Sequence, residues 1–212
     1  MSIFGEILRS IVSNRNGVII FYNSPIFDLI KQIRKEAEML IGNVEAYNLF
    51  MLIKKIEKIK GDIAEVGVAG GGSAKLICEA KGNKILHLFD TFEGLPEGDT
   101  QYKKGQFPAL FEKVKNYLRK YKNVHIYKGL FPVTAEPVKN RKFSFVHLDV
   151  DIYKSTLDSL TFFYSRMNKG GIIISDDYLF SKGVRKAVDG FFQDKPEPII
   201  ELSNSQCLVV KV

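Results

Sequence analysis

The chain has 212 residues, of which 45% are hydrophobic and 26% are charged. This composition is typical of one soluble globular domain, alone or with a small extension, and it excludes a disordered chain, a collagen-like fibre and a membrane bundle. Two cysteines are too few for a disulfide framework. The net charge of +7 would suit a nucleic-acid partner, but the lysines are spread along expected helix surfaces, so we interpret them as solvated faces.

Residues 1–60 are expected to form helices that cap the main domain or provide an interface, and residues 61–212 are expected to form the main domain. Apolar residues recur at helical spacing over 26–40 and again over 47–56. No run approaches the roughly 18 apolar residues of a membrane span, and the N-terminus lacks the pattern of a signal peptide. We therefore expect a cytoplasmic protein without a membrane partner.

From residue 61 onward, short apolar runs alternate with helical patterns. The expected strands cover residues 63–68, 85–89, 124–127, 143–148, 171–175, 198–202 and 207–212. The expected helices cover residues 73–80, 107–121, 155–167 and 184–192. This alternation predicts a doubly wound α/β fold with a mostly parallel sheet. The last two strands are joined by only a short turn, so one of them must run antiparallel, because a parallel crossover needs a dozen or more residues.

A glycine-rich turn follows the first expected strand of the sheet. It begins at Glu65 and Gly67, continues through Val68 and Ala69, and reaches the next helix at Ser73 after three more glycines. Such a turn lets a ligand approach the backbone, and the helix start offers free N–H groups. The dinucleotide fingerprint requires glycine where Ala69 stands. An acid two residues before the first glycine is instead typical of S-adenosylmethionine (SAM) sites.

Asp90 ends the second expected strand. A carboxylate in that place can accept hydrogen bonds from both hydroxyls of a ribose. Taken alone, Asp90 could equally be a turn acid or a helix cap. Together with the glycine turn, it favours a nucleoside-binding site.

Four aspartates follow two later strands: Asp149 and Asp151 after one, Asp176 and Asp177 after the next. Because ligands bind at the carboxyl ends of parallel strands, these side chains should converge. Crowded carboxylates repel each other unless a cation or protons compensate, and an all-oxygen set favours Mg²⁺ over Zn²⁺. Helix capping or pairing with lysines remains the alternative. We interpret His147, just before them, as a structural histidine.

Four segments together resemble the macrocin, mycinamicin and novobiocic acid O-methyltransferase family. They read EVGVAGGGS at 65–73, LFDTFEGLP at 88–96, HLDVDIYKST at 147–156 and GGIIISDDY at 170–178. The resemblance runs from about residue 61 to 192. It implies a Rossmann-like class I methyltransferase fold with a seven-stranded, mostly parallel sheet, one antiparallel strand and added N-terminal helices. It also implies SAM and Mg²⁺ as cofactors.

The resemblance implies roles for individual residues. The cofactor-binding set is Glu65, Gly67, Val68, Ala69, Ser73, Asp90, Thr91, Phe92, Lys128, Gly129 and Asp149. The metal ligands are Asp149, Asp176 and Asp177. Asp151 is the general base, with Asp149 beside it in the catalytic set. Residues 92–105 belong to a mobile lid, the acceptor is a small-molecule hydroxyl such as that of a sugar, and a homodimer is possible.

Three other functions remain open on sequence grounds. A nucleic-acid or protein methyltransferase would suit the positive charge, but the aromatic motif of many nucleic-acid enzymes is replaced here by residues 149–153. A nicotinamide-dependent oxidoreductase is disfavoured by Ala69. A non-catalytic SAM-binding protein would be expected to lack the carboxylates, and all of them are present.

Overall fold

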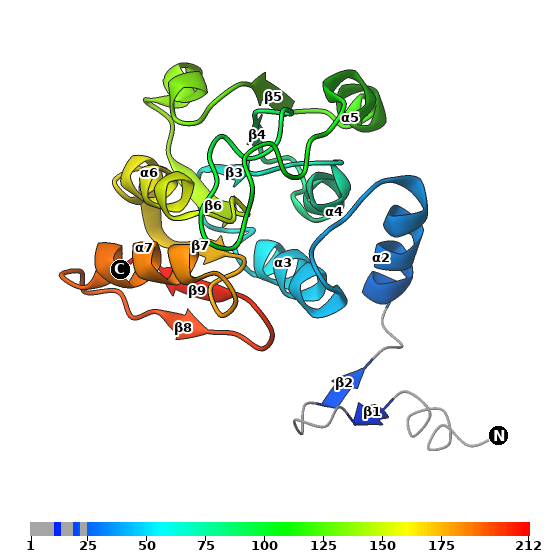
Figure 1. Cartoon of the computed structure of the whole chain (residues 1–212). Coiled ribbons are helices and arrows are strands. Elements are labelled where there is room, and N and C mark those ends of the chain that lie inside the picture. The colour runs from blue at the N-terminus through cyan, green and yellow to red at the C-terminus, as the bar shows by residue number, and fades with distance from the viewer. Residues whose placement is uncertain (1–10, 14–18, 22–24) are drawn as a thin grey trace.

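The computed structural model describes residues 11–13, 19–21 and 25–212 (Figure 1). Its helices are α2 (Pro25–Glu36), α3 (Asn43–Lys55), α4 (Gly72–Ala80), α5 (Phe111–Leu118), the 3₁₀ helix η1 (Val133–Val138), α6 (Tyr153–Tyr164) and α7 (Lys182–Phe192). Its strands are β1 (Ile11–Ser13), β2 (Ile19–Phe21), β3 (Asp62–Val66), β4 (Leu86–Asp90), β5 (Val124–Lys128), β6 (Phe143–Leu148), β7 (Met167–Ser175), β8 (Ile200–Glu201) and β9 (Cys207–Val210).

Seven strands form one sheet in the order β5-β4-β3-β6-β7-β9-β8. The pairs from β5 to β7 are parallel, and β9 runs antiparallel to both of its neighbours. The predicted doubly wound sheet with one reversed strand near its edge is confirmed. The order reverses direction between β3 and β6, which is where ligands bind in open α/β sheets.

Helices cover both faces of the sheet, as Figure 1 shows. Successive strand residues point to opposite faces. One face packs with α2, α3, α4 and α5 and includes Ile63, Leu86, Leu88, Phe145, Ile172 and Ile174. The other packs with η1, α6 and α7 and includes Ala64, Val66, Phe89, Val146, Leu148 and Ile173. Both faces are apolar, which explains why these strands read as continuous apolar runs.

The N-terminal part is only partly helical. The helical patterns are confirmed as α2 and α3, but β1 and β2 form an antiparallel pair where helix was expected. Apart from Ser13, the residues of both strands are β-branched or aromatic, which favours strand. The remainder of that expectation, over 1–10, 14–18 and 22–24, lies outside the described residues.

The segment after α2 packs against the glycine turn. A Cβ on Gly72 would lie 2.5 Å from the Glu38 carbonyl oxygen, and one on Gly70 would lie 2.6 Å from the Glu38 Cβ. The Gly72 N–H also donates to that carbonyl, at 3.1 Å. Two of the glycines expected to admit a ligand therefore admit the backbone of the N-terminal segment instead.

All four helices expected after residue 61 have somewhat different bounds in the structure, and two of them differ by more than two residues at one end or both. The helix expected over 107–121 begins only at Phe111, because Phe107 has a left-handed φ of 63° and precedes Pro108, a position that disfavours helix. The helix expected over 155–167 begins at Tyr153 and ends at Tyr164, and Met167 already opens β7, paired with Phe143.

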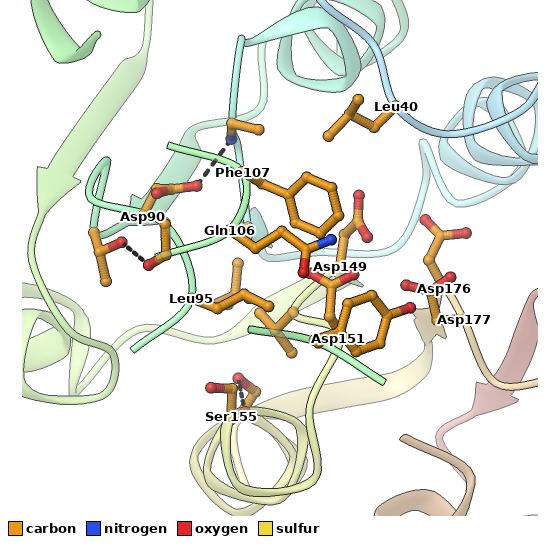
Figure 2. Close-up of a pocket in the computed structure, with 18 of the residues that line it drawn as sticks. Leu40, Asp90, Leu95, Gln106, Phe107, Asp149, Asp151, Ser155, Asp176 and Asp177 are labelled. Carbon is orange, nitrogen blue, oxygen red and sulfur yellow. Dashed lines mark hydrogen bonds between the residues drawn. The ribbon is translucent and has the colours of Figure 1, made fainter. Parts of the chain in front are cut away.

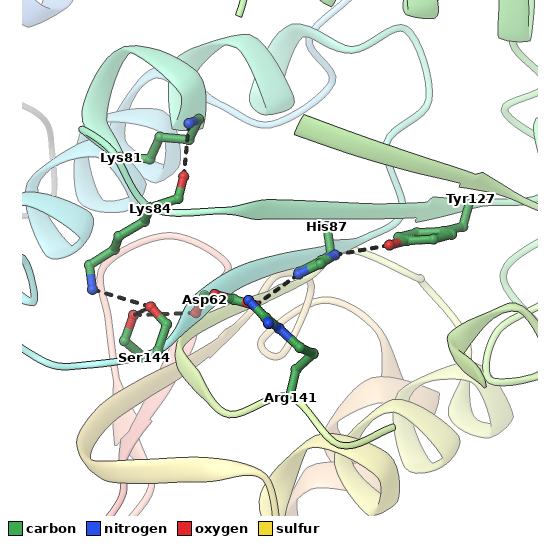
Figure 3. Close-up of polar contacts among 8 residues, drawn as sticks. Asp62, Lys81, Lys84, His87, Tyr127, Arg141 and Ser144 are labelled. Carbon is green, nitrogen blue, oxygen red and sulfur yellow. Dashed lines mark hydrogen bonds and ion pairs between the residues drawn. The ribbon is translucent and has the colours of Figure 1, made fainter. Parts of the chain in front are cut away.

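A polar cluster of Asp62, His87, Tyr127 and Arg141, here called the basal cluster, lies toward the amino ends of β3 and β4 (Figure 3). Asp62 Oδ2 accepts from Arg141 Nε at 2.6 Å and lies 3.0 Å from His87 Nε2, and His87 Nδ1 lies 3.1 Å from the Tyr127 hydroxyl. Burial lowers the pKa of His87. A neutral ring that donates to Asp62 and accepts from Tyr127 satisfies every one of these contacts.

Among the described residues, none of the helices is both long and apolar enough to cross a bilayer.

Candidate active site

A cavity of about 450 Å³ opens at the carboxyl ends of the central strands. Figure 2 shows Asp90 on one side of it and Asp149, Asp151, Asp176 and Asp177 on the other. We call these last four the pocket carboxylates. The convergence predicted from two successive strand ends is confirmed, because all four line this one cavity.

Asp90 is held in place by backbone amides. Its Oδ2 accepts from the N–H groups of Val68 at 2.6 Å and Ala69 at 2.9 Å, and its Oδ1 accepts from the Phe92 N–H at 2.6 Å. The carboxylate thus joins the glycine turn to the start of the next loop. Gly67, Ala69, Thr91 and Gly129 line the cavity with it.

The backbone of Gly67 brings the glycine turn against the pocket carboxylates. Gly67 has a φ of 87°, and a Cβ there would lie 1.7 Å from the carbonyl oxygen of Asp149. Any side chain would therefore push β3 and β6 apart at this level. Glycine is required here by close packing of two backbones as well as by its φ.

Five residues of the expected cofactor set do not line the cavity. Glu65 and Ser73 are buried, and Lys128 forms an exposed ion pair with Glu93. Val68 and Phe92 are buried in the core, and they reach the site only through the N–H groups that they donate to Asp90.

The pocket carboxylates form a compact set of oxygen ligands. Oxygens of Asp149, Asp151 and Asp177 lie within 4.8 Å of one another, and Asp149 and Asp176 form a second such group with His147. Asp149 belongs to both groups, so its oxygens lie near both Asp176 and the Asp151–Asp177 pair. One oxygen of Asp176, Oδ1, is buried without a partner.

Burial and mutual repulsion favour the protonated forms of Asp149, Asp151 and Asp177. Burial, and then the charge of Asp176, raise the pKa of Asp149 well above its usual value. Burial and the charge of Asp177 raise the pKa of Asp151 to about 8, and burial also raises the pKa of Asp177. Asp151 and Asp177 share a hydrogen bond. Without a cation, this site holds protons at neutral pH.

His147 is satisfied, as the sequence interpretation expected, but its partners were not foreseen. Its Nδ1 lies 2.9 Å from Glu65 Oε1, and its Nε2 lies 2.5 Å from Asp176 Oδ2. Burial alone would lower the pKa of His147, but the hydrogen bonds to Asp176 and Glu65 raise it well above the usual value. A protonated ring would donate from both nitrogens, one to each carboxylate. No sequence motif specifies these contacts. The contact with Glu65 follows from the register of the sheet, which pairs Glu65 of β3 with His147 of β6.

The loop after β4 covers the cavity. Leu95, Pro96, Tyr102, Gln106 and Phe107 all line it. Figure 2 shows Gln106 and Phe107 between Asp90 and the pocket carboxylates. Burial, and then the charges of Asp177, Asp151 and Asp149, raise the pKa of Tyr102, so its phenol stays protonated and can donate a hydrogen bond. Part of the expected lid, residues 92–105, therefore forms part of the cavity wall through Leu95, Pro96 and Tyr102.

Sequence reasoning missed Glu45 of α3 and Ser205 before β9. Both line the cavity and both are buried, and Ser205 Oγ donates to Glu45 Oε1 at 3.1 Å. The Oε2 atom of Glu45 has no partner. Glu45 lies in no motif, so only the packing of α3 reveals it. Six carboxylates line the cavity, and none of its described lining residues is Lys, Arg or His.

Known proteins share this architecture. The chain superposes on the structure of the O-methyltransferase NovP with a TM-score of 0.72 and 23% identity, covering 82% of each chain. The fold is therefore that of the class I O-methyltransferases, with a Rossmann-like sheet.

The model of the macrocin-O-methyltransferase (TylF) family matches residues 33–207. The chain belongs to this family, whose class of activity is O-methyl transfer. The match begins before α3, so the N-terminal helices that the sequence interpretation set apart are included from residue 33.

Two curated relatives are similar over most of the chain. Demethyldecarbamoylnovobiocin O-methyltransferase of Streptomyces niveus is 26% identical over 177 residues, which is 73% of this chain and 68% of that protein. 8-Demethyl-8-(2,3-dimethoxy-alpha-L-rhamnosyl)-tetracenomycin-C 4'-O-methyltransferase of Streptomyces olivaceus is 27% identical over 164 residues, which is 67% of this chain and 63% of that protein. The chain thus spans about two thirds of the length of these relatives.

Proposed function

We propose that the protein transfers a methyl group from SAM to a hydroxyl group of a small molecule, a sugar or a sugar-bearing metabolite, with Mg²⁺ bound beside the acceptor. The observation that carries this proposal is that one cavity holds both Asp90 with its glycine turn and the pocket carboxylates. A sugar acceptor is supported by the tetracenomycin relative, whose name specifies a rhamnosyl substrate.

The side of the cavity around Asp90 fits the nucleoside. Asp90 is fixed by three amide donors, two on Oδ2 and one on Oδ1, which leaves about one lone pair, on Oδ1, for a ribose hydroxyl. The backbone of Gly67 and Gly129 allows the ligand to approach closely. Glu65, Val68, Ser73, Phe92 and Lys128, which do not line the cavity, are proposed to act by shaping this side.

The pocket carboxylates fit a hard divalent cation. The four acids offer only oxygen donors, Asp149 lies within 4.8 Å of Asp176 and, in a second group, of Asp151 and Asp177, and the Oδ1 atom of Asp176 lacks a partner. Neither group contains Asp149, Asp176 and Asp177 together, so the assignment requires Asp176 and Asp177 to approach each other when the ion binds. We assign Asp149, Asp176 and Asp177 as the ligands of Mg²⁺. The ion would supply charge that orients the acceptor hydroxyl and lowers its pKa.

Asp151 is the proposed general base. It lies among the pocket carboxylates, and its pKa of about 8 suits a group that accepts a proton near neutral pH. Asp149 holds its position beside Asp151 through β6 and the Gly67 contact. Tyr102 and Phe107 close the cavity over these acids and exclude water from them.

The acidic lining also bears on the acceptor. A cavity lined by six carboxylates would repel the phosphates of a nucleic acid, despite the chain's net charge of +7. This supports a small acceptor over a nucleic acid.

The proposal is tested by incubating the protein with methyl-labelled SAM and a panel of glycosides that carry vicinal hydroxyls, with Mg²⁺ or with EDTA. Labelled methyl ether should form with Mg²⁺ and should not form with EDTA. Turnover that EDTA leaves unchanged would refute the metal assignment, and labelling of RNA in place of the glycosides would refute the acceptor class.

A further inference from the structure

Three buried side chains form a continuous polar bridge beneath the cavity. Glu65 Oε1, the two ring nitrogens of His147 and Asp176 Oδ2 are linked by contacts of 2.9 and 2.5 Å. The side chains of Glu65 and His147 are both 0% exposed, and that of Asp176 is 3% exposed. We call this set the buried bridge.

One end of the buried bridge, Asp176, lines the cavity, and the other end, Glu65, lies beneath the proposed nucleoside side. Glu65 precedes the glycine turn by two residues, so it supports the proposed nucleoside side. Asp176 follows β7 and lines the cavity among the pocket carboxylates. Each acid uses one oxygen for His147 and keeps the other unpartnered in a buried place: Oε2 of Glu65 and Oδ1 of Asp176.

We propose that His147 is a positioning residue that couples the binding of SAM to the binding of Mg²⁺, by holding Glu65 and Asp176 at a fixed separation. This inference rests on the proposed function. Both ring nitrogens are engaged, so a ligand that reorients one acid must move the ring and with it the other acid. The ligand that binds first orders the bridge, and the second ligand then binds a site already in place.

The basal cluster provides a contrast within the same sheet. His87 is also a buried histidine bonded to an acid, but that acid, Asp62, is also paired with Arg141 and has no oxygen that is both fully buried and unpartnered. His87 is therefore saturated, and it lies at the end of the sheet opposite the cavity. His87→Gln is the matched control, since it removes a buried imidazole without touching the buried bridge.

The experiment measures the affinity of S-adenosylhomocysteine, the demethylated product, by calorimetry with and without Mg²⁺, and the affinity of Mg²⁺ with and without this product. The product lacks the sulfonium charge, so direct repulsion of the metal by that charge is avoided. In the wild type, each ligand should increase the protein's affinity for the other ligand by the same factor, about fivefold or more.

Two substitutions separate the two ends of the bridge. In His147→Asn the amide nitrogen can replace Nδ1, which faces Glu65, so binding of the product should be kept while Mg²⁺ affinity falls by about 10- to 100-fold. In His147→Gln the amide nitrogen can replace Nε2, which faces Asp176. In this variant the affinity for Mg²⁺ should be kept, and the affinity for the product should fall. Both variants should lose the mutual tightening, and His87→Gln should keep it.

The inference is overturned if the wild type binds both ligands independently, if either His147 variant keeps the wild-type coupling, or if both variants weaken both ligands equally. A wild type that binds neither ligand would instead refute the proposed function. If the variants do not fold, the inference is tested on the wild type by NMR of the two ring nitrogens of His147. Mg²⁺ alone should shift the NMR signals of both nitrogens, and an unmoved Nδ1 signal would refute the coupling.

Discussion

The two ends of the central sheet carry polar clusters with opposite charge balance. In the basal cluster, the buried carboxylate of Asp62 has a cation and a neutral imidazole as partners, and the imidazole has the Tyr127 hydroxyl. Among the pocket carboxylates, burial and like charges raise the pKa of Asp149, Asp151 and Asp177, and Asp176 keeps a buried oxygen unpartnered.

This difference distinguishes polar groups that stabilise the fold from polar groups that are available to bind a ligand. A buried charge that is fully paired contributes to one arrangement of the chain and has nothing left to offer a ligand. Buried acids without partners are costly to the fold, so their retention at a cavity indicates a ligand that completes them. The two regions should therefore respond in opposite ways to substitution.

The largest expected effect is on turnover, in Asp151→Asn. Loss of the general base should lower kcat by about 10²–10⁴-fold, without loss of stability, because the change removes one of several repelling acids. Steady-state methyl transfer measures the first effect and thermal unfolding the second. Asp62→Asn is the control and should keep kcat within about twofold; equal losses of activity in both variants would erase the distinction between the two regions.

The next effect is the pH dependence of metal binding. Since the pKa of Asp151 is raised to about 8, the metal-free site holds a proton on this acid at lower pH, and the charge of Mg²⁺ bound at the neighbouring Asp149 and Asp177 favours its release. The apparent affinity for Mg²⁺ should fall by up to about tenfold per pH unit below pH 8. Calorimetry in buffers of different ionisation enthalpy should detect the released proton, and a pH-independent affinity would contradict the assignment.

The same pKa shift has a consequence for the metal-free fold. Between the ordinary pKa of an aspartate and pH 8, the folded state binds more protons at Asp151 than the unfolded state does, so this residue's contribution to stability declines as the pH rises. Mg²⁺ should therefore raise the melting temperature more at pH 8 than at pH 6.

The smallest effect is the stability loss in the basal cluster. Asp62→Asn should lower the free energy of unfolding by about 2 kcal/mol, because it weakens hydrogen bonds to a charged carboxylate while the half-exposed Arg141 is rehydrated. Chemical denaturation measures this change. A variant as stable as the wild type would show that the basal cluster does not stabilise the sheet.

The sheet topology could be predicted because its signals are local. Apolar runs alternate with helical patterns from residue 61 onward, and the short final turn dictates the reversed strand. The later start of α5 was only partly predictable: Pro108 disfavours helix at Phe107, but the left-handed φ of Phe107 arises where the covering loop meets the cavity.

The candidate site was predictable where strand ends define it and not where side chains meet across strands. Asp90 and the pocket carboxylates each end a strand, so topology alone brings them together. The burial of Glu65 beneath the cavity depends on its contact with His147, and that contact requires the register of β3 against β6. Glu45 enters the cavity from α3, whose packing no motif specifies.

The most direct test of the account is the structure of the protein with S-adenosylhomocysteine and Mn²⁺, with the metal located by anomalous scattering. The account predicts one metal peak bonded to the carboxylates of Asp149, Asp176 and Asp177, and a ribose hydroxyl bonded to Asp90 in the same cavity. A metal peak away from these aspartates, or a nucleoside bound away from Asp90, would contradict it.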